Sequence, residues 1–287
     1  MFNDQRQVGF TLIELVITLV VSSVVVSFMA LFLSGPVVGF TDQARRAGLV
    51  DAADSALRRM GRDVRRALPN SIRTRAAGGV VALELLSTVD GVRYRAQPPG
   101  TADQILDFTN ADTAFNVISQ FTQIAKPFSS TTHYLSIYNV GVPGADAYEL
   151  ANVVTSPGTQ INIAVDGGTG EDRVTLAPAF QFAFGSPTQR VFLVDGPVSY
   201  LCDPGSGTLT RYAGYAIALD QSTRDSAAEL LGAGAAASLM ADGIANCTFS
   251  YAPGTAERAG LLSMEIGVSA LGESINLLSQ VHVDNVP

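Results

Sequence analysis

The feature that most constrains this chain is an apolar run close to its N-terminus. Residues 10–33 are 24 consecutive positions that carry one charge, Glu14. As a helix they would measure about 36 Å, enough to cross a hydrocarbon core of about 30 Å. The run is too long for the apolar region of an ordinary signal peptide. A carboxylate inside a membrane span costs about 2–3 kcal/mol at the centre and less near the interface, so an ordinary anchor does not account for Glu14.

The residues around Glu14 form a specific motif. The heptapeptide Gly9-Phe10-Thr11-Leu12-Ile13-Glu14-Leu15 resembles the cleavage and methylation motif of type IV prepilins and type II secretion pseudopilins. The resemblance implies that residues 1–9 are a leader, that a prepilin peptidase cuts after Gly9, and that Phe10 is then N-methylated. It also implies that Glu14, the fifth mature residue, acts in assembly. Gly9 has no side chain to obstruct the peptidase.

The helical pattern extends well beyond the membrane span. Gly35 and Pro36 are expected to interrupt the helix, because proline lacks an N–H donor. An apolar stripe of helical period then follows, and it ends before Pro69. We therefore expect a long, kinked helix over residues 10–70, with the span at 10–33 and an amphipathic second half. The stripe consists of Val50, Ala53, Leu57, Met60, Val64 and Ala67.

Two faces of this helix have alternative interpretations. Small residues at Ser23, Ser27, Ala30 and Ser34 share one face, which either allows close helix approach or is simply tolerated in a membrane helix. Seven arginines decorate the second half. They form either a solvated surface or contacts with acidic patches of neighbouring subunits. They are Arg45, Arg46, Arg58, Arg59, Arg62, Arg65 and Arg66.

Residues 71–287 have a different character, because short apolar runs alternate with turn residues. One segment, 226–240, is rich in Ala and Leu and is predicted to be helical. The fold class is therefore α+β: a long N-terminal helix, transmembrane and then amphipathic, packed on a β-rich pilin-like globular domain. The predicted strands are 80–86, 133–140, 173–176, 179–184, 190–194, 198–201, 209–213, 247–251, 262–269 and 274–283.

Charge and cysteine usage narrow the functional classes. Residues 1–75 contain 10 Arg and 6 acids, whereas the remainder contains 8 basic and 20 acidic residues, so the body is strongly acidic. An acidic body repels phosphates, which argues against nucleic acid as a partner. Two Cys and two His are too scattered for a zinc site. In an exported chain, Cys202 and Cys247 are expected to form one disulfide that staples residues 213–246 to a sheet.

Two weaker motifs in the sequence have structural explanations that we favour over a binding site. Residues 232–237 fit a degenerate dinucleotide fingerprint, but a helix is expected before them where a strand is needed. The loop 166–172 carries three acids among glycines, and an acidic solvated turn is favoured over calcium binding. The sequence contains no nucleophile elbow and no phosphate-binding loop. We therefore predict no cofactor, no metal and no enzymatic activity.

Three body segments make the resemblance narrower, towards the minor pilins of the mannose-sensitive haemagglutinin (MSHA) pilus. It implies a subunit that helps to initiate or cap a filament, with a single pass in the bacterial inner membrane and a periplasmic domain before assembly into a pilus or pseudopilus. The implied partners are the prepilin peptidase, other minor and major pilins, the inner-membrane assembly platform and, before assembly, membrane lipid. A J-type pseudopilin of type II secretion and a tip adhesin are the alternatives. The segments are 178–182, 198–202 with 209–212, and 280–287.

Overall fold

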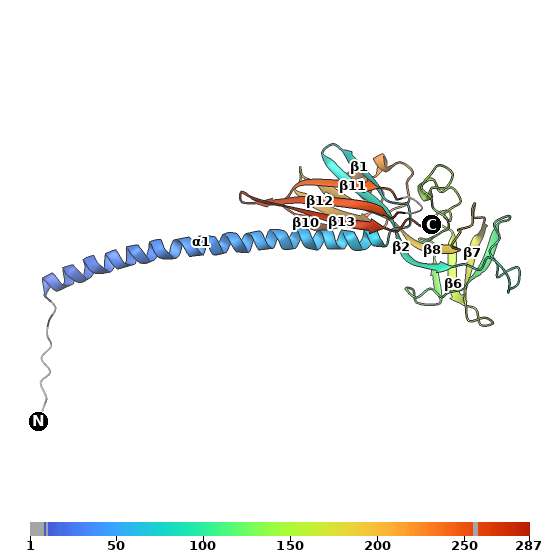
Figure 1. The fold of residues 1–287 in the computed structure, drawn as a ribbon, viewed down its shortest axis with the longest axis horizontal. Coiled ribbons are helices and arrows are strands. Elements are labelled where there is room, and N and C mark those ends of the chain that lie inside the picture. The colour runs from blue at the N-terminus through green and yellow to red at the C-terminus, as the bar shows by residue number, and fades with distance from the viewer. Residues whose placement is uncertain (1–8, 10, 255–257) are drawn as a thin grey trace, which may run out of the picture. The chain divides into compact units, whose positions relative to one another are not determined.

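The computed structural model describes residue 9 and residues 11–287 apart from 255–257, and it leaves out the side chains at 31 and 33–38. The chain divides into two compact units, Met1–Leu49 and Val50–Pro287. The predicted α+β class is confirmed, since an N-terminal helix is followed by antiparallel sheets (Figure 1). The helices are α1 (Leu12–Arg65), α2 (Ala227–Gly232) and the short 3-10 turns η1 (Ala147–Glu149) and η2 (Gln221–Thr223). The strands are β1 (Arg73–Ala77), β2 (Val80–Arg93), β3 (Asp112–Val117), β4 (Phe128–Ser130), β5 (Tyr134–Ser136), β6 (Gln160–Val165), β7 (Asp172–Phe180), β8 (Arg190–Asp203), β9 (Thr208–Ala213), β10 (Ala236–Asp242), β11 (Ile244–Ala252), β12 (Gly260–Ala270) and β13 (Glu273–Val283).

Helix α1 is continuous through Gly35 and Pro36, so the expected interruption there is wrong. One missing N–H removes one hydrogen bond, and the helical turns on both sides still propagate. The helix also ends at Arg65, five residues before the predicted limit at residue 70. At that point the Leu68 N–H donates to the Leu86 carbonyl at 2.7 Å. Pairing with β2 therefore ends the helix before Pro69 can do so.

The two halves of α1 differ as the pattern predicts. The segment Leu12–Ala30 has a mean hydropathy of 2.4 and is long and apolar enough to cross a membrane. In the second half, the side chains of Ala53, Leu57, Met60 and Val64 are buried, which confirms most of the stripe. Val50 does not belong to the buried stripe, because 38% of its surface is exposed.

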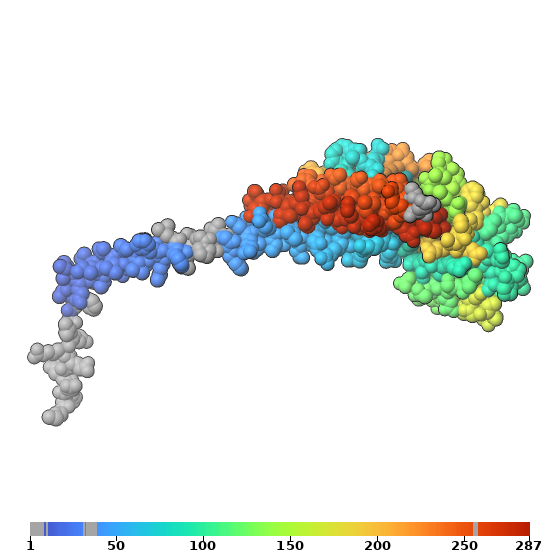
Figure 2. Space-filling view, in the orientation of Figure 1, coloured from blue at the N-terminus to red at the C-terminus, as the bar shows by residue number. Residues whose placement is uncertain are grey.

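Three antiparallel sheets make up the body. The first has the order β1-β2-β8-β9-β10, with β5 added to β8; the second is β11-β12-β13; the third is β3-β7-β6-β4. The second sheet lies against the later part of α1, where a Cβ on Gly61 would meet Val281 of β13 at 3.4 Å. Figure 2 shows these C-terminal strands, in red, directly beside the light-blue helix.

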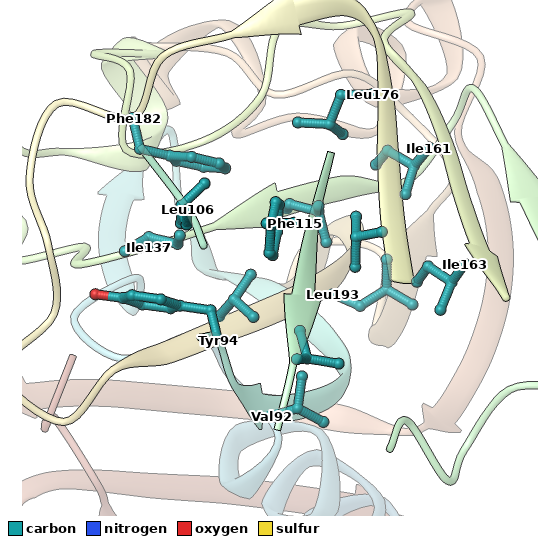
Figure 3. Close-up of a cluster of buried hydrophobic side chains, with 14 of the residues drawn as sticks. Val92, Tyr94, Leu106, Phe115, Ile137, Ile161, Ile163, Leu176, Phe182 and Leu193 are labelled. Carbon is teal, nitrogen blue, oxygen red and sulfur yellow. The ribbon is translucent and has the colours of Figure 1, made fainter. Parts of the chain in front are cut away.

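The third sheet encloses a hydrophobic core of its own. Phe115 lies at its centre among aromatic and aliphatic side chains from β3, β5, β6, β7 and the adjoining ends of β2 and β8 (Figure 3). We call this part of the body, residues 89–193, the outer lobe. It is inserted between the two longest strands, β2 and β8, which continue into the first sheet. The sequence resembles nothing specific over most of this region, yet it folds around a centre of fully buried apolar side chains.

Several predicted boundaries need correction. The paired predictions 173–176 with 179–184, and 190–194 with 198–201, are single strands, β7 and β8, while the strand predicted at 133–140 shrinks to β5. Strands β1, β3, β4 and β6 were not predicted. The helix predicted at 226–240 is wrong in its second half, because α2 stops at Gly232 and β10 pairs with β9. Alanine favours helices only weakly, and an available partner strand outweighs that preference.

Candidate functional site

The N-terminal motif places Glu14 in the first turn of α1. Thr11 precedes the helix, and its hydroxyl oxygen accepts a hydrogen bond from the Glu14 backbone N–H at 3.3 Å. The same hydroxyl donates to the Glu14 carboxylate at 3.4 Å. Thr11-x-x-Glu14 is thus related to a capping box. This pattern is visible in the sequence but was not predicted, because the same residues belong to the prepilin motif. A carboxylate at this end also complements the positive end of the helix dipole.

Gly9 is exposed and has open space where a side chain would be. That setting suits a scissile bond, which needs an extended and accessible backbone. Phe10 and residues 1–8 lie outside the described residues, so the predicted methylation at Phe10 stays a prediction. The described part of the motif thus brings an accessible glycine, a capping threonine and a carboxylate to the start of an apolar helix.

Two of the small residues predicted to share a face of the span bond to their own helix, whereas the side chain of Ser34 lies outside the described residues. The hydroxyls of Ser23 and Ser27 donate to the carbonyls of Val20 and Ser23, at 2.8 and 2.7 Å. A serine whose hydroxyl is satisfied by its own helix presents only a small, low-polarity surface to a neighbour. This arrangement allows another helix to approach closely in an apolar environment.

A polar anchor joins the last turns of α1 to the first sheet. The Asp63 carboxylate accepts hydrogen bonds from the Tyr200 hydroxyl at 2.7 Å and from Arg211 Nε at 2.8 Å. Burial, together with the nearby Asp63 charge, raises the pKa of Tyr200. These groups line a cleft of about 240 Å³, which is also lined by Arg59 and Arg62 of α1.

A second polar cluster is buried inside the first sheet. Glu84 is fully buried, pairs with Arg73 at 2.7 Å and accepts from the Tyr215 hydroxyl at 3.0 Å. Arg73 also stacks on the Tyr148 ring, 3.6 Å from its centroid. Burial raises the pKa of Glu84 although Arg73 opposes the shift. The cluster joins β1, β2 and the segment after β9, and nothing in the sequence pattern marked it.

The two cysteines are close enough to bond. Cys202 of β8 and Cys247 of β11 are paired in a disulfide, with 6.4 Å between their Cα atoms, inside the usual range. The bond joins the first sheet to the second, and β9, α2 and β10 lie in the loop that it closes. Among the described strands, these two sheets share no ladder hydrogen bonds, so the disulfide is a covalent link between them.

The weaker motifs find structural explanations. The order around residues 232–237 is helix and then strand, the reverse of what a dinucleotide site needs. In the loop 166–172, Asp166 accepts from Asn116 at 2.8 Å and Glu171 pairs with Arg95. The hydrogen bonds from Asn116 and from the Gly168 N–H hold the pKa of Asp166 at about 2. Among the described residues, no group of three or more His, Cys, Asp or Glu is placed to hold a metal.

Comparison with known proteins supports the N-terminal motif alone. Residues 5–30 match the family model described as the prokaryotic N-terminal methylation motif. No curated protein and no solved structure matches the chain. The chain therefore carries a type IV prepilin-like leader motif in front of an apolar helix suited to membrane anchoring.

Proposed function

We propose that this chain is a type IV pilin-like subunit that assembles into a filament through its N-terminal helix. The observation that carries the proposal is the methylation motif over residues 5–30, placed at the start of an apolar helix with Glu14 in its first turn. In this proposal residues 1–9 are the leader, 10–70 the helical stalk and 71–287 the periplasmic domain. The role is structural and needs no catalytic group. A prepilin peptidase, other pilins and the inner-membrane assembly platform are the proposed partners.

The finer assignment is a minor pilin of the MSHA type, most like MshO, that helps to initiate or cap the filament. The chain length and the three body segments support it. A J-type pseudopilin of type II secretion has the same general design, and genes next to the coding sequence, for a pilus or for secretion, separate the two. A tip adhesin is the third candidate. An adhesion assay on the purified protein tests it, and binding to a host surface would favour that assignment.

Processing is the first experiment. Cleavage after Gly9 and methylation of the new N-terminus predict a mature protein that begins with N-methylated Phe10. Mass spectrometry of protein recovered from membranes or filaments measures this directly. An assembled protein that still begins with Met1 contradicts the proposal.

The role of Glu14 is the second experiment. Cleavage would leave a cationic amine on Phe10, and a carboxylate in an apolar helix bundle is stabilised by such a partner. We favour the amine of a neighbouring subunit, which would set the axial register; the subunit's own amine is the alternative. The variant Glu14→Ala is therefore expected to insert and to be cleaved normally but to assemble poorly.

A matched control separates pairing from capping. Thr11→Ala removes the hydroxyl that contacts Glu14 and keeps the carboxylate. If Glu14 acts through an amine, Thr11→Ala assembles well while Glu14→Ala does not. Cleavage, membrane level and subunit content of sheared filaments are measured for both variants. Wild-type incorporation of the Glu14→Ala subunit would refute the assembly role.

A further inference from the structure

The cleft beside the Asp63 anchor has an excess of positive charge. Its walls carry the guanidinium groups of Arg59, Arg62 and Arg211, while Asp63 supplies its one carboxylate. Asp63 is already engaged by Arg211 and Tyr200. Within the described part of the chain, Arg59 and Arg62 form no ion pair and no side-chain hydrogen bond, and both are exposed. Two guanidinium groups are therefore available to an anion.

The cleft is bounded by an unpaired sheet edge. Ser238 lines it from β10, which is the last strand of the first sheet and, among the described strands, pairs with β9 alone. Residues of β10 are largely exposed, including Leu239 at 61%. An edge strand accepts a protein segment readily, because its free N–H and C=O groups can bond to another backbone. The cleft volume of about 240 Å³ leaves room for a carboxylate side chain.

We propose that the cleft formed by Arg59, Arg62 and Ser238 receives an acidic side chain from the body of an adjacent filament subunit. Guanidinium groups bind carboxylates in a bidentate geometry, which fixes orientation as well as adding affinity. Charge complementarity supports the partner: residues 76–287 of this chain hold 20 acids against 8 basic residues, and a subunit with a similar body would present the matching charge. The inference rests on the proposed function, since it requires neighbours in a filament.

Charge reversal in the full-length chain tests the proposal. Arg59→Glu with Arg62→Glu is expected to lower the amount of this subunit in sheared filaments about tenfold or more, because like charges then face each other. Arg58→Glu with Arg65→Glu makes the same change of charge on the same helix outside the cleft, and it is expected to assemble normally. Membrane level and protease resistance of each variant verify insertion and folding.

Cross-linking then identifies what enters the cleft. A photo-reactive amino acid at Ser238 is expected to capture a filament-subunit peptide containing Asp or Glu. Reversing that acid to Arg should restore assembly of the Arg59→Glu, Arg62→Glu variant. A lipid adduct, a peptide without an acid, or failure of the rescue overturns the proposal. Equal loss in both arginine pairs also overturns it, because a general charge effect would then explain the defect.

The design distinguishes the two levels of inference. If the wild-type chain is absent from filaments, the proposed function fails. If the wild type is present and the Arg59→Glu, Arg62→Glu variant is incorporated equally well, the cleft is not a docking site and the pilin-like function stands.

Discussion

Replacing Asp63 by alanine tests whether the anchor between α1 and the first sheet stabilises the body. The change removes the acceptor of both the Tyr200 hydroxyl and Arg211 Nε. Tyr200 is fully buried, and a buried donor left without a partner costs about 1–3 kcal/mol. The Arg211 side chain keeps 29% of its surface exposed. Water can therefore solvate its guanidinium, and loss of a partly exposed ion pair adds less than about 1 kcal/mol.

One effect acts in the opposite direction. Asp63 lies two residues from the end of α1, where the negative end of the helix dipole disfavours a carboxylate by about 0.3–1 kcal/mol. The orphaned tyrosine is the larger effect, so Asp63→Ala is expected to lower the free energy of unfolding by about 1–3 kcal/mol. For a unit of this size that corresponds to a drop in Tm of about 2–12 °C. Near-UV circular dichroism of the full-length protein in mild detergent can follow it, since the chain has 8 Tyr and no Trp.

A double-mutant cycle isolates the cause. Tyr200→Phe removes the hydroxyl, so adding it to Asp63→Ala leaves no buried donor without a partner. The double variant is therefore expected to be less destabilised than the sum of the single variants, by about 1 kcal/mol or more. Additive effects within about 0.3 kcal/mol would show that the two groups do not depend on each other, and that the orphaned hydroxyl is not the source of the loss.

Two further predictions concern the disulfide and Glu84. The bond between Cys202 and Cys247 closes a loop of 45 residues, so replacing both by serine should cost about 4 kcal/mol by chain entropy; urea unfolding measures it, and two free thiols per native chain would contradict the bond. Because burial raises the pKa of Glu84 above its unfolded value, its stabilising contribution is present below about pH 4.5 and is lost as pH rises through the folded pKa. The free energy of unfolding is measured for wild type and for Glu84→Gln from pH 4 to 8. The wild type is expected to become less stable relative to Glu84→Gln as pH rises, and a difference that stays constant with pH would contradict this.

The sequence predicted those parts of the fold that have a regular period. The stripe from Ala53 to Val64 was recognised because its spacing matches one helix face, and its burial confirms that. The helix expected over 226–240 is wrong in its second half, because amino-acid composition does not indicate whether a partner strand is available. Gly234, at φ +86°, ends the helical turn, and β10 then pairs with β9. Likewise β3 pairs with β7, which lies beyond β4, β5 and β6 in the chain, so no local pattern indicates this pairing.

Polar anchors escape sequence analysis for a different reason. In the sequence, Asp63 is one acid on an arginine-rich part of the helix, and Glu84 is one acid in an apolar run. Asp63 accepts from Tyr200 and Arg211, both more than 130 residues away in the chain. Glu84 pairs with Arg73 of the adjacent strand, but its tyrosine partner, Tyr215, is also more than 130 residues away. No local sequence pattern predicts such a long-range contact, because the spacing between the partners depends on the length of the intervening lobe. Short motifs that act locally, such as Thr11 and Glu14, are the polar sites that can be recognised in advance.

The junction between α1 and the outer lobe follows from a pair of offsetting bulges. Asp195 of β8 and Val89 of β2 are each an extra residue in the ladder, so pairing is interrupted and then resumes in its earlier register. Bulges bend and twist a ladder, which lets the two strands leave the first sheet and enter the outer lobe. Beside this break the Arg66 carbonyl accepts hydrogen bonds from the Thr88 N–H and hydroxyl, at 2.9 and 2.7 Å. The chain that leaves the helix is thus fixed to β2 where the sheet bends, so the outer lobe is connected to α1 through hydrogen-bonded backbone and not through a flexible linker.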